Sequence, residues 1–283
     1  HPDVAPLPPA TPCASGVKLL RGVPYAVPEG GRPLELDLWL PPAAAEGPVP
    51  VVLCVHGGAW RRGRREDIGF RMREWNPGPF ARLAASGVAV ASADYRLSGE
   101  ATFPAPLDDL RAALRWLGLR SGELGLDTAR TVVWGESAGG HLASLLALTV
   151  TDPAPVGAVV WYGPSDLTTP RGGFDPHSDA SPEALLLGAA PADVPEAARA
   201  ASPVAHVRTG APPFLLVHGE RDTMVSRSHS EELAARLRES GVPVELRYVP
   251  GADHGWYGAS DAQVEDVFQR SLRFVRSPSR GAE

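Results

Sequence analysis

The chain has 283 residues, of which 43% are hydrophobic and 21% are charged, as in ordinary soluble globular proteins. Its formal net charge of −6 argues against general nucleic-acid binding, because that activity requires a basic surface. The sequence holds no apolar window of about 18 residues, so we expect no membrane span. This length predicts one large α/β domain or two small ones.

The first sixteen residues are rich in proline and predict an extended or disordered arm (1–16) ahead of a single domain (17–283). The chain begins with His1 rather than Met, which indicates a processed or engineered end. No charged-then-apolar signal peptide follows it. We therefore expect a cytoplasmic protein, with secretion left open.

The predicted strands change in character along the chain. Residues 34–40 alternate apolar and polar side chains, as a half-buried antiparallel strand does. The later runs are short and mostly continuously apolar, which suits strands buried on both faces of a parallel sheet. These runs cover residues 49–55, 88–93, 131–135, 156–162, 213–218 and 242–249.

Helical periodicity occupies the intervals between these strands. The predicted helices cover residues 106–121, 137–149, 228–240 and 261–275. Strands that alternate with helices predict an α/β fold with a mostly parallel, doubly wound sheet and an antiparallel lead-in.

One interval is longer than a crossover between parallel strands requires. Residues 164–205 are therefore predicted to form a small cap insertion, with short helices near 182–188 and 193–201. A decorated crossover without a gating role stays open as the alternative.

The sequence Gly135-Glu136-Ser137-Ala138-Gly139 follows an apolar strand and begins an apolar helix, which is the context of a nucleophile elbow. Such a turn lifts the serine hydroxyl above the sheet, and a side chain at Gly135 or Gly139 would collide with neighbouring backbone. The helix directs its positive end toward a developing oxyanion. Ser137 is therefore predicted to be a nucleophile.

A serine nucleophile requires a base, and the base requires an orienting acid. Asp222 and His254 lie on the loops after the last two predicted strands, in the order that this chemistry uses on a parallel sheet. Asp222 is preferred to Glu220 because of its distance from the strand end and its shorter side chain. Asp253 is interpreted as a loop or capping residue.

The stretch His56-Gly57-Gly58-Ala59-Trp60 follows another predicted strand. Glycines in such a position let backbone N–H groups approach a tetrahedral oxyanion, together with the N–H of Ala138. His56 is expected to anchor this loop. The other histidines are assigned to structural positions (His141, His218, His229) or to solvent (His177, His206).

Four arginines follow the glycine stretch: Arg61, Arg62, Arg64 and Arg65. We interpret them as a solvated loop, with contact to an acidic substrate as a second interpretation. The sequence holds no phosphate-binding glycine motif and no metal-ligand spacing, so neither a cofactor nor a metal is predicted.

Together these segments resemble the α/β-hydrolase esterases, specifically the hormone-sensitive-lipase-like and feruloyl- or acetylxylan-esterase-like group with HGGxW and GESAGG motifs. Asp94-Tyr95-Arg96-Leu97 resembles a further element of that group, and the similarity spans about residues 34–275.

This resemblance implies an α/β-hydrolase fold in which Ser137 is the nucleophile, His254 the base and Asp222 the orienting acid. It also implies three backbone amide donors to the oxyanion, the first two placed to within one position: Gly58, Ala59 and Ala138.

The predicted function is a serine hydrolase that cleaves small-molecule carboxylic esters through an acyl-enzyme intermediate, without a cofactor. Trp60, Tyr162 and Trp256 flank the catalytic loops and are predicted to line the substrate pocket, although core packing explains them equally well. Two alternatives stay open, namely an amide-cleaving relative (arylformamidase- or peptidase-like) and a catalytically silent homologue that binds a ligand or partner. The natural substrate and the oligomeric state are not predicted.

Overall fold

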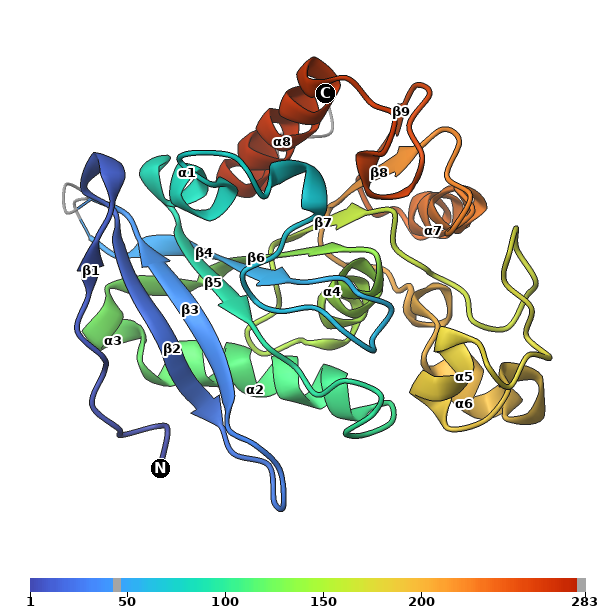
Figure 1. Cartoon of the computed structure of the whole chain (residues 1–283), viewed down its shortest axis with the longest axis horizontal. Helices are drawn as coiled ribbons and strands as arrows, with labels where there is room; N and C mark the ends of the chain where they lie inside the picture. Colours follow the sequence, from blue (N-terminus) through green and yellow to red (C-terminus); the bar gives the residue numbers. More distant parts are fainter. Residues whose placement is uncertain (43–46, 279–283) are drawn as a thin grey trace.

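Nine strands form one mixed sheet in the computed structural model, which describes residues 1–42 and 47–278 (Figure 1). The strands lie in the spatial order β1-β2-β3-β5-β4-β6-β7-β8-β9. Their bounds are β1 Thr11–Pro12, β2 Lys18–Ala26, β3 Leu34–Leu40, β4 Val49–Val55, β5 Ala89–Ala93, β6 Leu126–Glu136, β7 Gly157–Trp161, β8 Phe214–Gly219 and β9 Val244–Val249.

The strand pairs at the N-terminal edge, from β1 to β5, are antiparallel, and the remaining pairs are parallel. The predicted mostly parallel sheet with antiparallel N-terminal strands is therefore confirmed. The loops that follow Val55, Glu136 and Trp161 begin side by side, because these residues end three neighbouring strands. Gly22 and Pro24 interrupt the apolar alternation of β2, so this strand is not predicted from the sequence.

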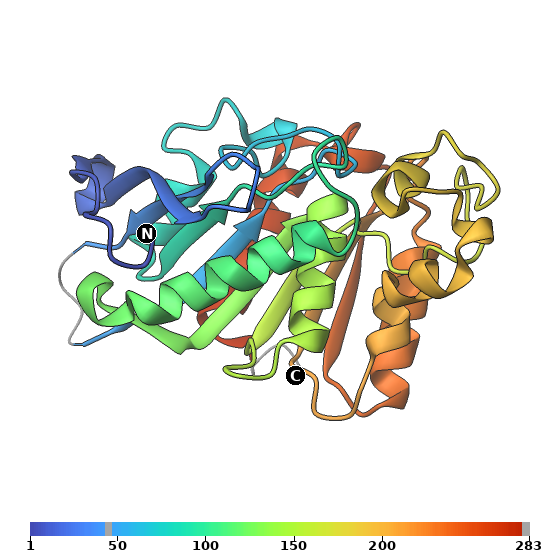
Figure 2. The ribbon, with the colours of Figure 1, turned by 90° about the horizontal axis from the view of Figure 1, so that it is seen from below.

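Helices cover both faces of the sheet, with α2, α4 and α7 on one face and α1 and α8 on the other (Figure 2). Their bounds are α1 Pro79–Ala85, α2 Ala105–Leu119, α3 Ser121–Leu124, α4 Ala138–Thr149, α5 Pro182–Leu187, α6 Pro195–Ala200, α7 Ser228–Glu239 and α8 Asp261–Arg276. Short 3₁₀ turns are η1 Ala14–Gly16, η2 Phe70–Met72, η3 Pro191–Asp193, η4 Pro203–His206 and η5 His254–Trp256. In the described part of the chain, no helix has the length and apolarity needed to cross a membrane.

Strand β4 illustrates why the central strands are apolar throughout. Val51, Leu53 and Val55 belong to the core beneath α2 and α4, while Val52 and Cys54 belong to the core beneath α1 and α8. A strand covered on both faces does not alternate between apolar and polar residues. Cys54 is only 2% exposed, and burial raises the pKa of its thiol, so it serves as a small packing residue.

The segment 1–16, which the sequence marks as an arm, makes specific contacts with the remaining chain. Strand β1 pairs with β2, and the carbonyl oxygen of Pro2 accepts a hydrogen bond from Trp116 Nε1 at 3.1 Å. At the other end of the predicted 17–283 domain, residues 279–283 lie outside the described residues.

The chain between β7 and β8 makes a long excursion that contains α5 and α6, close to the two short helices predicted there. This segment lies beside α7 in both views of the ribbon (Figures 1 and 2). The carbonyl of Leu186 accepts a hydrogen bond from the N–H of Phe103, and the N–H of Ser165 donates to His229 Nδ1 at 3.0 Å. Hydrogen bonds to α7 and to the loop before α2 thus anchor the excursion.

The turn between β6 and α4 depends on glycines that meet backbone directly. A Cβ added to Gly135 would lie 2.0 Å from the carbonyl oxygen of Gly139, and one added to Gly139 would lie 2.1 Å from that of Val55. Real Cβ atoms do not approach backbone oxygens so closely, so these two positions exclude any side chain. The expected collision at Gly135 and Gly139 is therefore present in the fold.

Replacement of Gly139 by Ala should lower the free energy of unfolding by roughly 1–3 kcal/mol or more, because β4 and α4 must separate to admit the methyl group. Gly118→Ala is the matched control, since Gly118 is an exposed residue of α2 whose added Cβ has its nearest neighbour at 4.0 Å. We expect that control to change stability by less than about 1 kcal/mol, in the stabilising direction. Urea unfolding of both variants tests this, and an equal effect of the two substitutions would contradict it.

Candidate active site

Ser137 occupies a strained backbone position at the N-terminus of α4. Its φ of 55° and ψ of −121° lie in a region that non-glycine residues rarely adopt. The N–H of Ser137 donates to the carbonyl of Trp161 at 2.9 Å, which holds the turn against β7. Strain of this kind is maintained by the surrounding structure and is concentrated at functional sites.

The structure brings Ser137, His254 and Asp222 into one hydrogen-bonded series. Ser137 Oγ lies 2.9 Å from His254 Nε2, and His254 Nδ1 lies 2.8 Å from Asp222 Oδ2. The serine follows β6, the aspartate follows β8 and the histidine follows β9, as the sequence pattern predicts. Because Asp222 faces Nδ1, the neutral imidazole is directed to carry its proton there and to offer Nε2 to the serine.

Several hydrogen bonds hold the carboxylate of Asp222. Its Oδ1 accepts the N–H groups of Met224 and Val225 at 2.9 and 2.8 Å. Burial alone would raise the pKa of Asp222, but hydrogen bonds from His218 and His254 outweigh burial and hold the pKa well below its usual range. The carboxylate thus stays charged.

His218 is a buried neighbour of this carboxylate that the sequence assigns only to a structural position. Its Nε2 lies 3.4 Å from Asp222 Oδ2 and 2.8 Å from the carbonyl oxygen of Val225, while its Nδ1 lies 2.7 Å from Ser230 Oγ. With two acceptors on one side, Nε2 carries the proton, and Nδ1 accepts from the serine hydroxyl. His218 therefore supports Asp222 at the same carboxylate oxygen that His254 contacts.

Asp253, the carboxylate next to the histidine in sequence, does not take part in this series. Its Oδ1 accepts the N–H of His254 at 2.7 Å and the N–H of Thr223 at 2.7 Å. Asp253 caps η5 and joins the loop after β8 to the loop after β9. This agrees with the capping interpretation.

Glu136 connects the serine turn to the glycine loop after β4, a role that was not predicted from the sequence. The N–H of Gly57 donates to Glu136 Oε1 at 2.7 Å, and a Cβ at Gly57 would lie 2.4 Å from the same oxygen. Burial raises the pKa of the Glu136 carboxyl, while the hydrogen bond from Gly57 opposes that rise. An acidic residue at the end of an apolar strand is the signal in the sequence that points to such a role.

The hydrogen bond to Glu136 distinguishes Gly57 from the two residues that follow it. In the described part of the chain, the N–H groups of Gly58, Ala59 and Ala138 form no hydrogen bond with another protein group. Both loop residues have positive φ, 121° for Gly58 and 56° for Ala59. The loop and the first turn of α4 therefore present free backbone donors near Ser137.

The glycine loop is anchored on its far side by Arg65, which the sequence places in a solvated loop. That placement is wrong for this residue: its side chain is 15% exposed and bonds Asp37 Oδ1 at 2.9 Å and Asp94 Oδ2 at 2.5 Å. Asp37 and Asp94 come from β3 and from the end of β5, so local sequence does not reveal that they meet Arg65. The buried His56, whose carbonyl oxygen accepts from Tyr95 Oη at 2.8 Å, also anchors the loop as expected.

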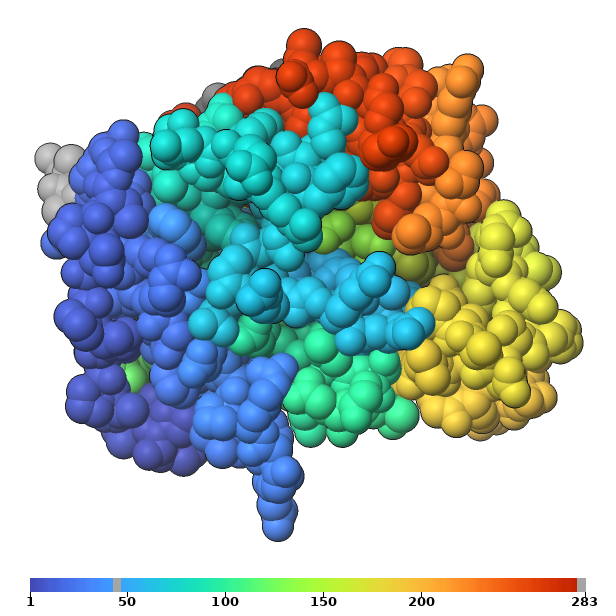
Figure 3. All heavy atoms as spheres, viewed as in Figure 1, coloured from blue at the N-terminus to red at the C-terminus, as the bar shows by residue number. Residues whose placement is uncertain are grey.

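Ser137, His254 and the glycine loop after β4 line a cavity of about 480 Å³. In Figure 3 it is a hollow between the light-blue and cyan loop after β4 and the orange-red loops after β8 and β9. Its lining comprises Gly57, Gly58, Ala59, Arg62, Gly63, Arg64, Asp67, Gly69, Phe70, Arg73, Glu136, Ser137, Tyr162, Met224, His254 and Gly255. No lining residue comes from the predicted cap insertion, 164–205.

Of the three aromatic residues predicted to line the pocket, only Tyr162 does so. Its ring packs on His254, with centroids 4.5 Å apart. Trp256 is 1% exposed and packs on Tyr162 from behind, with centroids 4.6 Å apart, within the core beneath α8. Trp60 is 2% exposed and donates its Nε1–H to His141 Nδ1 at 3.1 Å. Both tryptophans therefore take the core-packing alternative.

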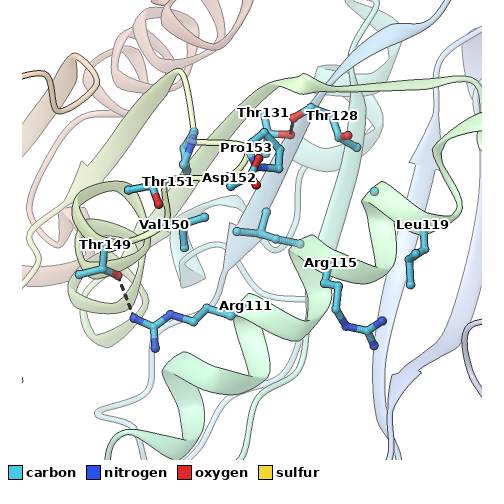
Figure 4. A pocket seen from close by; sticks show the side chains of 13 residues that line it. Arg111, Arg115, Leu119, Thr128, Thr131, Thr149, Val150, Thr151, Asp152 and Pro153 are labelled. Carbon is cyan, nitrogen blue, oxygen red and sulfur yellow. Dashed lines mark hydrogen bonds between the residues drawn. The ribbon is translucent and has the colours of Figure 1, made fainter.

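A second cavity, of about 560 Å³, lies at the opposite end of β6, between α2 and the C-terminal end of α4 (Figure 4). Figure 4 shows Arg111 bonded to Thr149 on one side of it. The residues that line this cavity include no histidine, cysteine or serine. Within residues 1–42 and 47–278, no cluster of three or more potential metal ligands occurs. The cavity at Ser137 thus has the reactive groups, although it is the smaller of the two.

Comparison with known proteins gives consistent matches. A sequence profile of the BD-FAE family matches residues 36–237. Esterase LipQ of Mycobacterium tuberculosis is 32% identical over 89% of this chain and 61% of LipQ, so the chain spans less than two thirds of that relative.

Solved structures match over almost the whole chain. The structure named Bacterial Heroin Esterase is 30% identical, with a TM-score of 0.75 over 95% of this chain and 85% of that chain. A truncated carbohydrate esterase from gut microbiota has a TM-score of 0.79 over 94% and 98% of the two chains, at 23% identity, which shows a shared fold alone. These matches confirm the predicted α/β-hydrolase fold.

Arg65→Gln should lower the free energy of unfolding by about 3 kcal/mol, because it leaves the carboxylates of Asp37 and Asp94 without their cation. Arg61→Gln is the control, since Arg61 is exposed and should tolerate the change within about 0.5 kcal/mol. Chemical unfolding at pH 7 measures both values. Equal stability of the two variants would show that Arg65 is not the anchor of this loop.

The buried His141 should make the protein sensitive to acid. Burial lowers the pKa of His141 to about 4, so between about pH 6.5 and 4 the unfolded chain binds a proton that the folded chain does not. The free energy of unfolding should therefore fall by about 3 kcal/mol over this range through His141 alone. His141→Asn, which can still accept from Trp60, should remove this part of the decrease. Unfolding curves measured from pH 7 to 4 test it, and parallel losses in both proteins would refute it.

Proposed function

This chain belongs to the BD-FAE family of α/β-hydrolases, and we propose that it hydrolyses carboxylic esters through Ser137, His254 and Asp222. One observation carries the proposal: a hydroxyl within 2.9 Å of an imidazole nitrogen lines the same cavity as free backbone N–H groups. These are the parts that acyl transfer requires, namely a nucleophile, its base and donors for an oxyanion. The names of the similar proteins, which are esterases, support esters over amides.

The reaction begins with attack by Ser137 Oγ on the ester carbonyl carbon, while His254 Nε2 takes the hydroxyl proton. The resulting imidazolium is stabilised by the charged carboxylate of Asp222, which lies 2.8 Å from Nδ1. The tetrahedral intermediate then collapses, and the alcohol leaves with the proton from Nε2. An acyl-enzyme remains, with its carbonyl carbon bonded to Oγ.

The second half repeats these steps with water. His254 takes a proton from a water molecule, and the oxygen of that water attacks the acyl-enzyme carbonyl carbon. Collapse of the second intermediate breaks the bond to Ser137 Oγ, which recovers its proton from Nε2. The carboxylic acid is released, and the enzyme returns to its starting state without a cofactor.

In both halves of the reaction, the N–H groups of Gly58, Ala59 and Ala138 donate hydrogen bonds that stabilise the negative charge on the carbonyl oxygen. Gly57 is not included, because its N–H already donates to Glu136. That hydrogen bond instead sets the position of the two loop donors, so Glu136 is a positioning residue. Donors held in place before the reaction need no reorientation when the charge develops.

The cavity admits substrates that are not purely hydrocarbon. The segment 164–205 lies to one side and contributes no residue to the lining, so it does not enclose a long acyl chain. Polar groups of the loop after β4 and apolar surface from Phe70 and Met224 face the same space. Esters with a short or bulky, partly polar structure fit this lining best.

Ser137→Ala should reduce kcat for 4-nitrophenyl acetate by about 10⁴-fold or more, because it removes the nucleophile. The matched control is Ser144→Ala in the same helix, whose buried hydroxyl donates to the carbonyl of Gly140 at 2.8 Å and has no other hydrogen-bond partner among the described residues. We expect the control to keep its turnover within about twofold. Circular dichroism verifies that both variants fold, and a fluorophosphonate should label the control but not Ser137→Ala.

Full turnover in a folded Ser137→Ala variant would overturn the proposal. A matched anilide, tested beside the ester, addresses amide cleavage: the ester should be the faster substrate. Folded wild-type protein that neither turns over the ester nor reacts with the fluorophosphonate would point instead to a silent homologue.

A further inference from the structure

Two arginines of the loop after β4 line the catalytic cavity without a charged partner. In the described part of the chain, the guanidinium groups of Arg62 and Arg64 form no hydrogen bond and no ion pair. A third arginine of the lining, Arg73, differs, because its Nε lies 3.0 Å from Asp67 Oδ1. The cavity therefore contains two unneutralised cations beside one internal ion pair.

The backbone of Arg62 is held by contacts with the loop residue Gly58, whose N–H group is one of the proposed oxyanion donors. The N–H of Arg62 donates to the carbonyl of Gly58 at 3.1 Å. A Cβ added to Gly58 would lie 2.1 Å from the carbonyl oxygen of Arg62 and 3.2 Å from its Cγ. The side chain of Arg62 thus begins directly beside a proposed oxyanion donor. Two residues beyond Gly63, the partly buried Arg65 anchors the loop to Asp37 and Asp94.

The charge of the lining is opposite in sign to that of the whole protein. Counted formally, with histidine neutral, the three arginines, Asp67 and Glu136 leave the lining with one net positive charge. The chain as a whole has a formal net charge of −6. A cleft of one sign within a surface of the other sign attracts a ligand of opposite charge, here an anion.

We propose, resting on the ester hydrolysis above, that Arg62 and Arg64 bind a carboxylate carried by the acyl or the alcohol part of the substrate. A guanidinium offers paired N–H donors that match the two oxygens of a carboxylate. A single carboxylate neutralises the net charge of the lining, whereas a phosphate dianion exceeds it. The apolar surface of Phe70 and Met224 accommodates the hydrocarbon between the ester and the acid.

The test compares matched ester pairs. For the acyl side, kcat/KM is measured for 4-nitrophenyl butyrate and for the 4-nitrophenyl half-ester of glutaric acid. For the alcohol side, phenyl acetate is compared with 3-carboxyphenyl acetate. Each pair is measured with wild type, Arg62→Gln, Arg64→Gln and the double variant, at low and at high salt. The readout is the ratio of anionic to neutral kcat/KM within a pair.

In at least one pair, the ratio for wild type should exceed one and should decrease with salt, because exposed charges are screened. Each single substitution should lower this ratio about threefold to fivefold, and the double variant should lower it further. Arg61→Gln removes an equal charge from an exposed neighbour outside the cavity lining, so its ratio should stay within about twofold of wild type. The pair that responds identifies which part of the substrate carries the carboxylate.

The outcomes separate this inference from the function on which it rests. If the neutral esters are hydrolysed but neither ratio responds to Arg62→Gln, Arg64→Gln or salt, the inference is wrong and the ester hydrolysis stands. An equal loss of the ratio in Arg61→Gln also overturns it, because the effect is then general electrostatics. If folded wild-type protein hydrolyses none of the four esters, the proposed function fails and the inference fails with it.

Discussion

The hydrogen bond from the N–H of Gly57 to the carboxyl of Glu136 is the contact that the rest of the site depends on. Glu136 ends β6 and immediately precedes Ser137, while Gly57 begins the loop after β4. One side chain therefore sets the distance between Ser137 and the loop that carries the free N–H groups. A Cβ at Gly57 would lie 2.4 Å from the carboxyl oxygen, so a side chain at that position would displace the carboxyl from its present place.

Backbone strain collects around this contact. Of the six non-glycine residues with positive φ among the described residues, five lie in or behind the catalytic cavity: Ala59, Trp60, Ser137, Tyr162 and Trp256. Strained conformations persist where neighbouring structure leaves no alternative. Here that constraint comes from the ends of adjacent parallel strands, from the two packed cores and from close backbone contacts that only glycine allows. The same rigidity keeps the free N–H groups of the loop and the imidazole of His254 in place, as the proposed reaction requires.

In the loop after β4, the short segment 61–65 contains arginines with two different roles. Arg65 points inward to buried carboxylates and stabilises the loop, whereas Arg62 and Arg64 face the cavity and leave it positively charged. Gly63, the glycine between them, has a φ of +103° and allows the sharp turn that sends the neighbouring side chains in different directions. Stability of the loop and the proposed selectivity for an anionic ester therefore depend on neighbouring residues of the same kind, and substitutions can separate the two effects.

Local pattern was sufficient for much of this protein. The seven predicted strands and the four principal helices are present in the structure, and their bounds agree closely except that β6 begins at Leu126 rather than at residue 131. Buried parallel strands and amphipathic helices have strong periodic signatures. The positions of Ser137, Asp222 and His254 after the ends of β6, β8 and β9 could also be read from the chain, since the order of a parallel sheet brings such loops together. The short helix α1 and the interrupted strand β2 have weak periodicity and were out of reach.

Tertiary structure alone decided which way individual side chains face. Trp60, Tyr162 and Trp256 all flank the proposed catalytic loops in sequence, yet only Tyr162 reaches the cavity. The two tryptophans instead pack into separate cores, one on each face of the sheet. Arg62 and Arg65 are equally charged and three positions apart, but only Arg65 meets carboxylates from distant strands. Such orientations depend on contacts between remote segments, and no local sequence pattern records those contacts.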